Sequence, residues 1–222
     1  MIQYILLTAN IIIFTPLFSI LIILVGVFDH QKIRTGYLVR LWACLILKLS
    51  NINYSLEGFD VIDPKKKYVI ISNHQSAIDI LLTFAIFPMP ISFFTKKELF
   101  LIPVFGLAMK YAGMIPVDRY SKEKSKKSVD IAVSKARNTQ LSFLNYPEGT
   151  RMTFDRLGKF KKGGFILAIK LGFPILPLTL VYRKSFIRIV VSDSIDSLNY
   201  ELSSKEILIK KTRDVIASHL SI

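Results

Sequence analysis

The sequence predicts an α/β fold: a single, largely parallel sheet flanked by helices, preceded by an N-terminal membrane-associated helical segment. From about Ile52 onwards, short apolar runs alternate with helical segments, which is typical of parallel strands joined by helices. Before that point the chain is strongly apolar, and residues 1–28 contain no charged side chain. We therefore expect membrane-anchoring helices in residues 1–50 and an α/β domain in residues 51–222.

The N-terminal region is long enough to cross a hydrocarbon core of ~30 Å, although Asn10 and Pro16 interrupt its apolar run. A second apolar stretch, YLVRLWACLILKLS, follows shortly afterwards. One span followed by an interfacial helix would satisfy this pattern, as would two short helices in one leaflet. The start lacks the positively charged leader of a signal peptide. The distribution of basic residues predicts that the body lies on the cytoplasmic side of the membrane. In a bacterium, this membrane would be the inner membrane.

In the body we expect seven strands, within NYSLEGFDVI, KYVIISN, ISFFTKKEL, GMIPVDR, LSFLNYPEGTR, PILPLTLVY and SFIRIVVSD. Helices are expected within AIDILLTFAIF, IPVFGLAMKYA, SKEKSKKSVDIAVSKARN, KKGGFILAIKLG and residues 203–222. Gly172 is expected to end the fourth of these helices. Ser203 and Glu206 have the spacing of a capping box at the start of the last one.

The composition combines an apolar end with a basic body. Hydrophobic residues make up 51% of the 222 residues, and the formal net charge is +14. This combination favours a membrane surface with anionic head groups. A basic chain can also bind nucleic acid, but no helix-turn-helix, ribonucleoprotein or zinc-finger pattern is present. We therefore expect the lipid bilayer as a partner and no nucleic acid.

The stretch ISNHQSAID contains a histidine and an aspartate at a spacing that a continuous helix would place on different faces. If His74 lies in the turn after a strand, Ser76 caps the following helix and the Asp79 carboxylate points back towards the imidazole. One interpretation is a polar turn and a helix cap only. The other is a proton-transferring pair in which Asp79 orients His74. Since no GxSxG pattern is present, such a pair would activate a hydroxyl of the substrate.

Metal chemistry is not expected. The three histidines, His30, His74 and His219, lie far apart in sequence, and no HExxH or CxxC spacing occurs. The single Cys44 lies in an apolar run and is expected to be a buried small hydrophobic residue.

Several cationic residues follow the ends of expected strands. Lys96 and Lys97 follow one strand, Arg119 a second, and Arg151 a third. Ligands of open α/β sheets bind at the carboxyl ends of strands, so these side chains and His74 should share one crevice. Lysine and arginine in such a crevice favour a phosphate ligand.

Together, these blocks resemble the glycerolipid acyltransferases with the HxxxxD motif, specifically the 1-acyl-sn-glycerol-3-phosphate (lysophosphatidic acid) acyltransferases. The matching blocks, in order, are NHQSAID, FFTKKELFLIPVFG, GMIPVDR, YPEGTR, GKFKKGG and GFPILPLTL, and they extend over about residues 71–180. Met152 stands where this family often has Ser. The resemblance implies that a fatty acyl group is transferred from acyl-CoA or acyl carrier protein to the sn-2 hydroxyl of lysophosphatidic acid. It implies no cofactor besides this co-substrate.

Carried over by position, the resemblance implies that His74 is the general base and Asp79 its orienting partner. It assigns the acceptor phosphate to Arg119 with Lys96 or Lys97 and Arg151, and it gives Glu148 and Gly149 of the YPEGTR block a positioning role. Two alternatives remain at this stage. One is an acyltransferase for another acceptor, such as a different lysophospholipid or glycerol 3-phosphate. The other is a catalytically silent membrane protein that binds anionic lipid.

Overall fold

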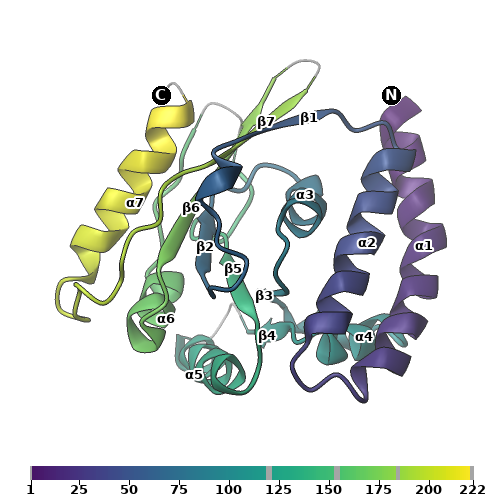
Figure 1. Ribbon diagram of the computed structural model, residues 1–222, viewed down its shortest axis with the longest axis horizontal. Coiled ribbons are helices and arrows are strands. Elements are labelled where there is room, and N and C mark those ends of the chain that lie inside the picture. Colours follow the sequence, from purple (N-terminus) through teal and green to yellow (C-terminus); the bar gives the residue numbers. More distant parts are fainter. Residues whose placement is uncertain (1, 119–121, 153–155, 184–185, 221–222) are drawn as a thin grey trace. The chain divides into compact units, whose positions relative to one another are not determined.

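The computed structural model describes residues 2–118, 122–152, 156–183 and 186–220 (Figure 1). The chain divides into two compact units, and each unit is built from two separate stretches of sequence. The first unit comprises Met1–Ile52 and Ile80–Leu141, and the second comprises Asn53–Asp79 and Ser142–Ile222. Each unit therefore depends on contacts between residues that are far apart in the chain.

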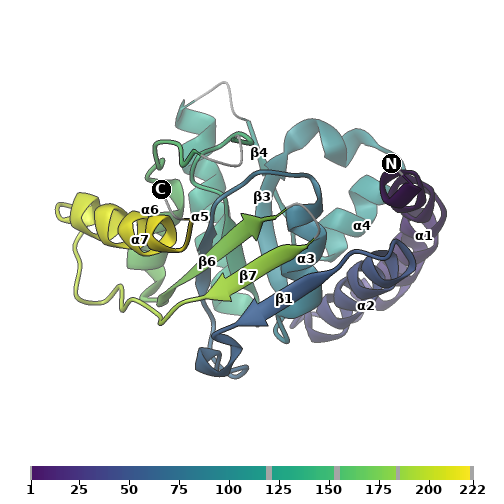
Figure 2. The ribbon, with the colours of Figure 1, turned by 90° about the horizontal axis from the view of Figure 1, so that it is seen from above.

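The first unit begins with two helices that lie side by side, α1 (Ile2–Gly26) and α2 (Ile33–Leu49) (Figures 1 and 2). Helix α2 buries one apolar face, which includes Val39, Ala43 and Ile46. Helix α1 is apolar on all sides and leaves many of its large side chains exposed. By length and composition, α1 is able to cross a membrane.

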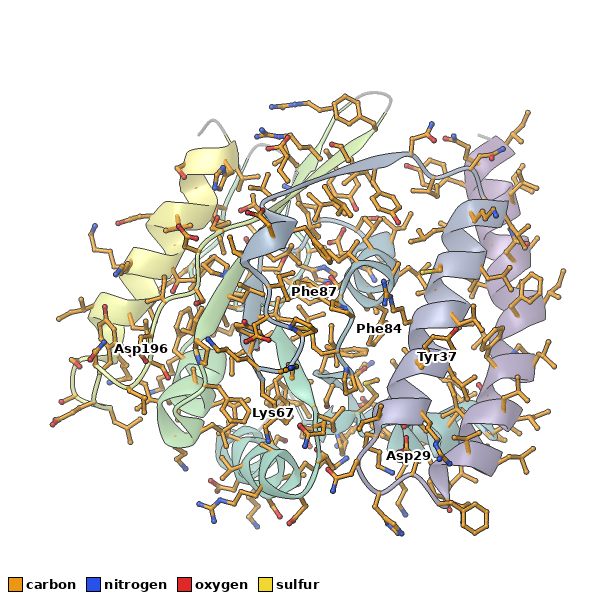
Figure 3. All side chains as sticks on the ribbon, viewed as in Figure 1. Asp29, Tyr37, Lys67, Phe84, Phe87 and Asp196 are labelled. Carbon is orange, nitrogen blue, oxygen red and sulfur yellow. The ribbon has the colours of Figure 1, made fainter. Side chains whose placement is uncertain are left out.

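Asp29, in the loop between these two helices, stabilises the start of α2 (Figure 3). Lys32, which precedes the helix, has φ of 64° and makes no side-chain capping hydrogen bond. Asp29 Oδ2 instead accepts hydrogen bonds from the backbone N–H and the hydroxyl of Thr35, both at 2.7 Å. A carboxylate in this position satisfies a helix-terminal amide and interacts favourably with the helix dipole.

The rest of the first unit contains two parallel strands, β3 (Ile91–Lys96) and β4 (Ile115–Val117). A 3₁₀ turn, η2 (Lys97–Leu101), and helix α4 (Phe105–Tyr111) connect them. Helix α5 (Lys122–Asn138) follows β4, and most of helix α3 (Ile78–Ile86) also belongs to this unit. Phe84 and Phe87, labelled in Figure 3, are buried in its core.

The second unit contains five strands in the order β1-β7-β6-β2-β5, of which β1, β7 and β6 are seen side by side in Figure 2. Their bounds are Tyr54–Glu57 for β1, Val69–Ser72 for β2, Ser142–Asn145 for β5, Ile175–Tyr182 for β6 and Ile187–Val191 for β7. All neighbouring strands are parallel except β6 and β7, which pair antiparallel. Strand β2 is buried throughout, as a central parallel strand should be. Two helices pack in this unit, α6 (Gly163–Leu171) and α7 (Lys205–Leu220), and a 3₁₀ turn, η1 (Phe59–Val61), follows β1.

The predicted fold class is confirmed: the chain is α/β with largely parallel strands, flanking helices and an apolar N-terminal helix. Gly172 follows the end of α6 with φ of 65°, as predicted. Helix α7, however, begins at Lys205, and the Ser203 hydroxyl donates to the Glu201 carboxylate at 3.2 Å. The predicted capping box of Ser203 and Glu206 is therefore wrong, because the helix begins later and Ser204, not Ser203, directly precedes it. The predicted functional division at residue 50 stays a prediction.

Candidate active site

His74 and Asp79 face each other in the second unit. His74 lies in the turn after β2, and its Nδ1 is 2.8 Å from Asp79 Oδ2. The Ser76 N–H donates to the same carboxylate oxygen at 2.9 Å, and Ser76 Oγ accepts from the Ile78 N–H at 3.4 Å. The helix cap expected from the sequence is therefore present, and it turns the Asp79 carboxylate towards the imidazole.

The Asp79 carboxylate is fully buried, and hydrogen bonds offset the cost of burying its charge. Oδ2 accepts from Gln75 N–H at 2.7 Å in addition to Ser76 N–H and the imidazole. Oδ1 accepts a short hydrogen bond from the hydroxyl of Tyr182, at the end of β6. Donors on both oxygens fix the orientation of the carboxylate.

Tyr182 is mostly buried. Burial, followed by the negative charge of Asp79, raises the pKa of the phenol well above its ordinary value. The hydroxyl therefore stays protonated at physiological pH and acts as a permanent donor to the carboxylate.

Glu148 and Met152 hold the backbone of His74 on both sides. The Glu148 carboxylate accepts from the His74 N–H at 3.2 Å, and the His74 carbonyl accepts from the Met152 N–H at 2.8 Å. A further bond joins the Gly158 N–H to the other Glu148 oxygen at 3.2 Å. Burial, only partly offset by these backbone donors, raises the pKa of Glu148. Glu148 is thus a link between two loops and the histidine backbone.

The imidazole ring is also fixed by stacking. The Tyr146 ring lies against the His74 ring with centroids 4.1 Å apart and an angle of 18° between the planes. Tyr146 ends the strand-to-turn segment from which Glu148 and Gly149 follow, and Gly149 adopts φ of 75°. Such a backbone conformation favours glycine, so the turn that presents Glu148 depends on this residue.

This arrangement leaves one ring nitrogen of His74 for chemistry. Because a carboxylate only accepts hydrogen bonds, Nδ1 carries the proton and Nε2 carries the lone pair. The His74 side chain remains 13% exposed, while Asp79 is completely covered. The pair can therefore remove a proton from a hydroxyl group that reaches Nε2, with Asp79 stabilising the imidazolium that forms.

The other residues predicted for the site are distributed over both units. Lys96 and Lys97 lie in the first unit, where the Lys97 ammonium forms an ion pair with Asp118 at 2.7 Å. Arg151 lies in the second unit and is exposed. Arg119 lies outside the described residues. The predicted common phosphate crevice stays a prediction.

A pocket of about 590 Å³ adjoins Glu148 in the second unit. Three lysines of the GKFKKGG block line it, Lys159, Lys161 and Lys162, together with Glu206 and Ile209 of α7. Within the described residues, no group of three or more His, Cys, Asp or Glu side chains has an arrangement that could hold a metal ion.

Sequence reasoning missed three residues that shape this site: Tyr182, Tyr146 and Asn73. Tyr182 is 103 residues from Asp79, and no local pattern relates the two positions. Tyr146 directly follows β5 and precedes Pro147 and Glu148. Its position at the end of a strand was the one feature of the sequence that could have indicated a place in the site. Asn73 pairs its side-chain amide with the backbone of Leu180, at 2.9 Å for the donated bond and 2.8 Å for the accepted one.

The fold and this site define an α/β protein with a partly exposed histidine that is oriented by a buried carboxylate. Residues 53–181 match the family described as Acyltransferase, and this match covers more than half of the chain. The chain belongs to the acyltransferase family.

Two named relatives are similar in sequence to part of this chain. A putative 1-acyl-sn-glycerol-3-phosphate acyltransferase of Caenorhabditis elegans, acl-1, is 36% identical over 136 residues, which is 61% of this chain and 52% of that protein. The 1-acyl-sn-glycerol-3-phosphate acyltransferase of Pseudomonas aeruginosa is 31% identical over 151 residues, or 66% of this chain and 58% of that protein. The chain thus spans about half the length of these relatives.

A solved structure has the same fold. The crystal structure of the 1-acyl-sn-glycerophosphate (LPA) acyltransferase PlsC from Thermotoga maritima matches with a TM-score of 0.68 and 22% sequence identity. The match covers 91% of this chain and 95% of that chain.

Proposed function

We propose that this protein is a membrane-bound acyltransferase that moves a fatty acyl group from an acyl thioester to the sn-2 hydroxyl of lysophosphatidic acid, which yields phosphatidic acid. The observation that carries the proposal is the 2.8 Å contact between His74 Nδ1 and the buried Asp79 carboxylate, which leaves Nε2 available as a base. The names of the relatives support this choice of acceptor.

In the proposed reaction, the acceptor hydroxyl lies at His74 Nε2. The imidazole takes the proton as the oxygen attacks the thioester carbonyl, and the new carbon–oxygen bond gives a tetrahedral intermediate. Collapse of this intermediate breaks the carbon–sulfur bond. The imidazolium returns the proton to the departing thiolate, so the enzyme ends in its starting state. Asp79 stabilises the imidazolium between these steps.

We further propose that Arg151, Arg119 and Lys96 or Lys97 bind the phosphate of the acceptor. Arginine suits this task because its planar guanidinium donates two parallel hydrogen bonds to one phosphate. The donor is acyl-CoA or acyl carrier protein, and the proposed mechanism requires no other cofactor.

We also propose that α1 anchors the protein in a membrane, with the second unit on the cytoplasmic side. Helix α1 is long and apolar enough to span, and only 22% of its most apolar window is buried within the protein. The two substrates carry acyl chains, so an enzyme attached to the bilayer meets them without extracting them fully into water.

The proposal is tested by His74→Ala in the full-length protein, assayed with a labelled acyl thioester and lysophosphatidic acid. Removing a general base is expected to lower kcat by roughly 10²–10⁴-fold. His219→Ala is the matched control, because His219 contacts Ser192 at 3.1 Å and takes no part in the pair. Unchanged turnover in the folded His74→Ala variant would rule out the mechanism. A panel of lysophospholipids and glycerol 3-phosphate tests the acceptor.

A further inference from the structure

The first unit carries an apolar surface outside its two N-terminal helices. This surface consists of Leu99, Leu101, Ile102, Val104 and Leu107, and we call it the 99–107 surface. Leu101 is 80% exposed, and the other four side chains are between 36% and 46% exposed. Single exposed apolar residues are ordinary on proteins, but a contiguous apolar segment of this kind marks a contact with a partner or a membrane.

The backbone of this segment holds its side chains outwards under strain. Val104 has φ of 61° and ψ of −57°, and the Phe105 N–H donates to the Pro103 carbonyl at 2.6 Å. This is a γ-turn with positive φ, which is rare and strained for any residue and most unfavourable for a β-branched one. Val104 is nevertheless 45% exposed. In a turn that faces water, glycine or asparagine would be favoured at a position with positive φ. The exposed apolar side chain of Val104 therefore indicates that this turn faces an apolar environment.

The surface lies next to the C-terminal end of α1. Helix α4 packs against α1 (Figure 2). A Cβ added to Gly26 would lie 2.7 Å from the Tyr111 Cβ, so the two helices touch at these residues. Leu107 precedes Tyr111 by four residues, which is about 6 Å along a helix axis. The exposed apolar residues of α4 are therefore close to the point where α1 ends.

Three lysines gather at the same end of α1. Lys32 Nζ donates to the Gly26 carbonyl at 3.4 Å, and Lys110 is the neighbour of Tyr111. Burial, and then the positive charges of Lys32 and Lys110, lower the pKa of Lys135. These ammonium groups are thus close enough to repel one another, and this suits a layer of anionic head groups.

We propose that the 99–107 surface inserts into the leaflet of an anionic bilayer that holds the C-terminal end of α1, with Lys32, Lys110 and Lys135 at the level of the head groups. The inference rests on the proposed membrane setting and adds a second, independent point of attachment. A helix alone leaves the protein free to rotate about the helix axis. Two contacts fix the first unit against the bilayer.

The test uses tryptophan fluorescence of the full-length protein in vesicles of phosphatidylcholine and phosphatidylglycerol with brominated acyl chains. The natural Trp42 is first replaced by Phe. Leu101→Trp reports on the 99–107 surface. Ile12→Trp reports on α1, about 21 Å along the helix from Gly26 at 1.5 Å per residue. Leu198→Trp is the matched control, because Leu198 is 74% exposed and belongs to the second unit.

The Leu101→Trp variant is expected to lose emission and shift to the blue on these vesicles, with stronger quenching by bromine near the head group than near the chain end. Ile12→Trp should also be quenched, and Leu198→Trp should not be quenched. Quenching of Ile12→Trp without Leu101→Trp would overturn the second contact and leave the anchor intact. Equal quenching of Leu198→Trp would show non-specific adsorption and also overturn it. If Ile12→Trp is not quenched, the proposed anchor and this inference both fail, whatever His74→Ala shows for catalysis.

Discussion

The Tyr182 hydroxyl is expected to hold the Asp79 carboxylate in position, and Tyr182→Phe tests this directly. The substitution removes one oxygen atom from a mostly buried side chain and preserves the ring. Asp79 then loses the donor to Oδ1, while its contacts with His74, Gln75 and Ser76 through Oδ2 remain.

The magnitude follows from the charge on the acceptor. A hydrogen bond to a charged group contributes about 1.5–3 kcal/mol, and Asp79 is fully buried, so the free energy of unfolding should fall by about that amount. If half of that loss is expressed in the transition state, about 0.75–1.5 kcal/mol, kcat should decrease by roughly 4- to 13-fold. KM should change little, because the phenol contacts the carboxylate and not the reacting groups. Since the raised pKa of Tyr182 keeps the phenol protonated, the ratio of the two kcat values should be constant across neutral pH.

The assay is steady-state acyl transfer across neutral pH, combined with urea unfolding. Tyr68→Phe is the matched control, because Tyr68 is also buried and its hydroxyl accepts a hydrogen bond from the Asp63 N–H at 3.1 Å. This control should lose about 0.5–1.5 kcal/mol of stability and keep its kcat. The reasoning is refuted if kcat of Tyr182→Phe stays within about twofold of wild type, since the carboxylate would then be held without the phenol.

Three further substitutions probe the supports of the imidazole. Burial raises the pKa of Glu148 above its ordinary value of about 4.5, so the folded state favours the protonated acid. Wild type should therefore lose stability relative to Glu148→Gln as the pH rises from about 4.5 through the raised pKa, and urea unfolding at several pH values measures this difference. Tyr146→Leu should lower kcat by up to about tenfold while Tyr146→Phe retains it, because an aromatic stack contributes about 0.5–1.5 kcal/mol; equal kcat values for the two variants would show that stacking is dispensable. Gly149→Ala should cost about 1–2 kcal/mol for its positive φ, whereas Gly163→Ala, whose Cβ meets nothing within 4 Å, should not; thermal unfolding compares them.

The local part of the site could be predicted from the sequence. The spacing of Ser76 and Asp79 specifies a helix cap, and a cap fixes where the carboxylate points relative to the preceding turn. The expected contact between His74 and Asp79 is present because all of its geometry lies within one turn and the start of one helix. The alternation of strands and helices likewise depends on local periodicity, and it predicted the fold class correctly.

The remaining part of the site depends on pairing between distant segments. Tyr182 reaches Asp79 only because β6 lies next to β2 in the sheet, and strand order is not encoded in local spacing. The same holds for Glu148, whose bond to the His74 backbone spans 74 residues. The start of α7 was misplaced for a different reason: Ser203 and Ser204 are neighbours, and either serine could precede the first turn of the helix.

The amide of Asn73 replaces a peptide group at the end of β2. Its side chain both donates to and accepts from the backbone of Leu180, so the hydrogen-bonding ladder continues for one more step after the main chain has turned away towards His74. An aspartate at position 73 would lack the N–H donor, and a leucine would lack both the donor and the acceptor. Slow deamidation of Asn73 would therefore replace a neutral amide with a buried carboxylate that faces the Leu180 carbonyl oxygen. Loss of this amide is therefore expected to weaken the pairing of the segment after β2 with β6, although His74 and Asp79 themselves are unchanged.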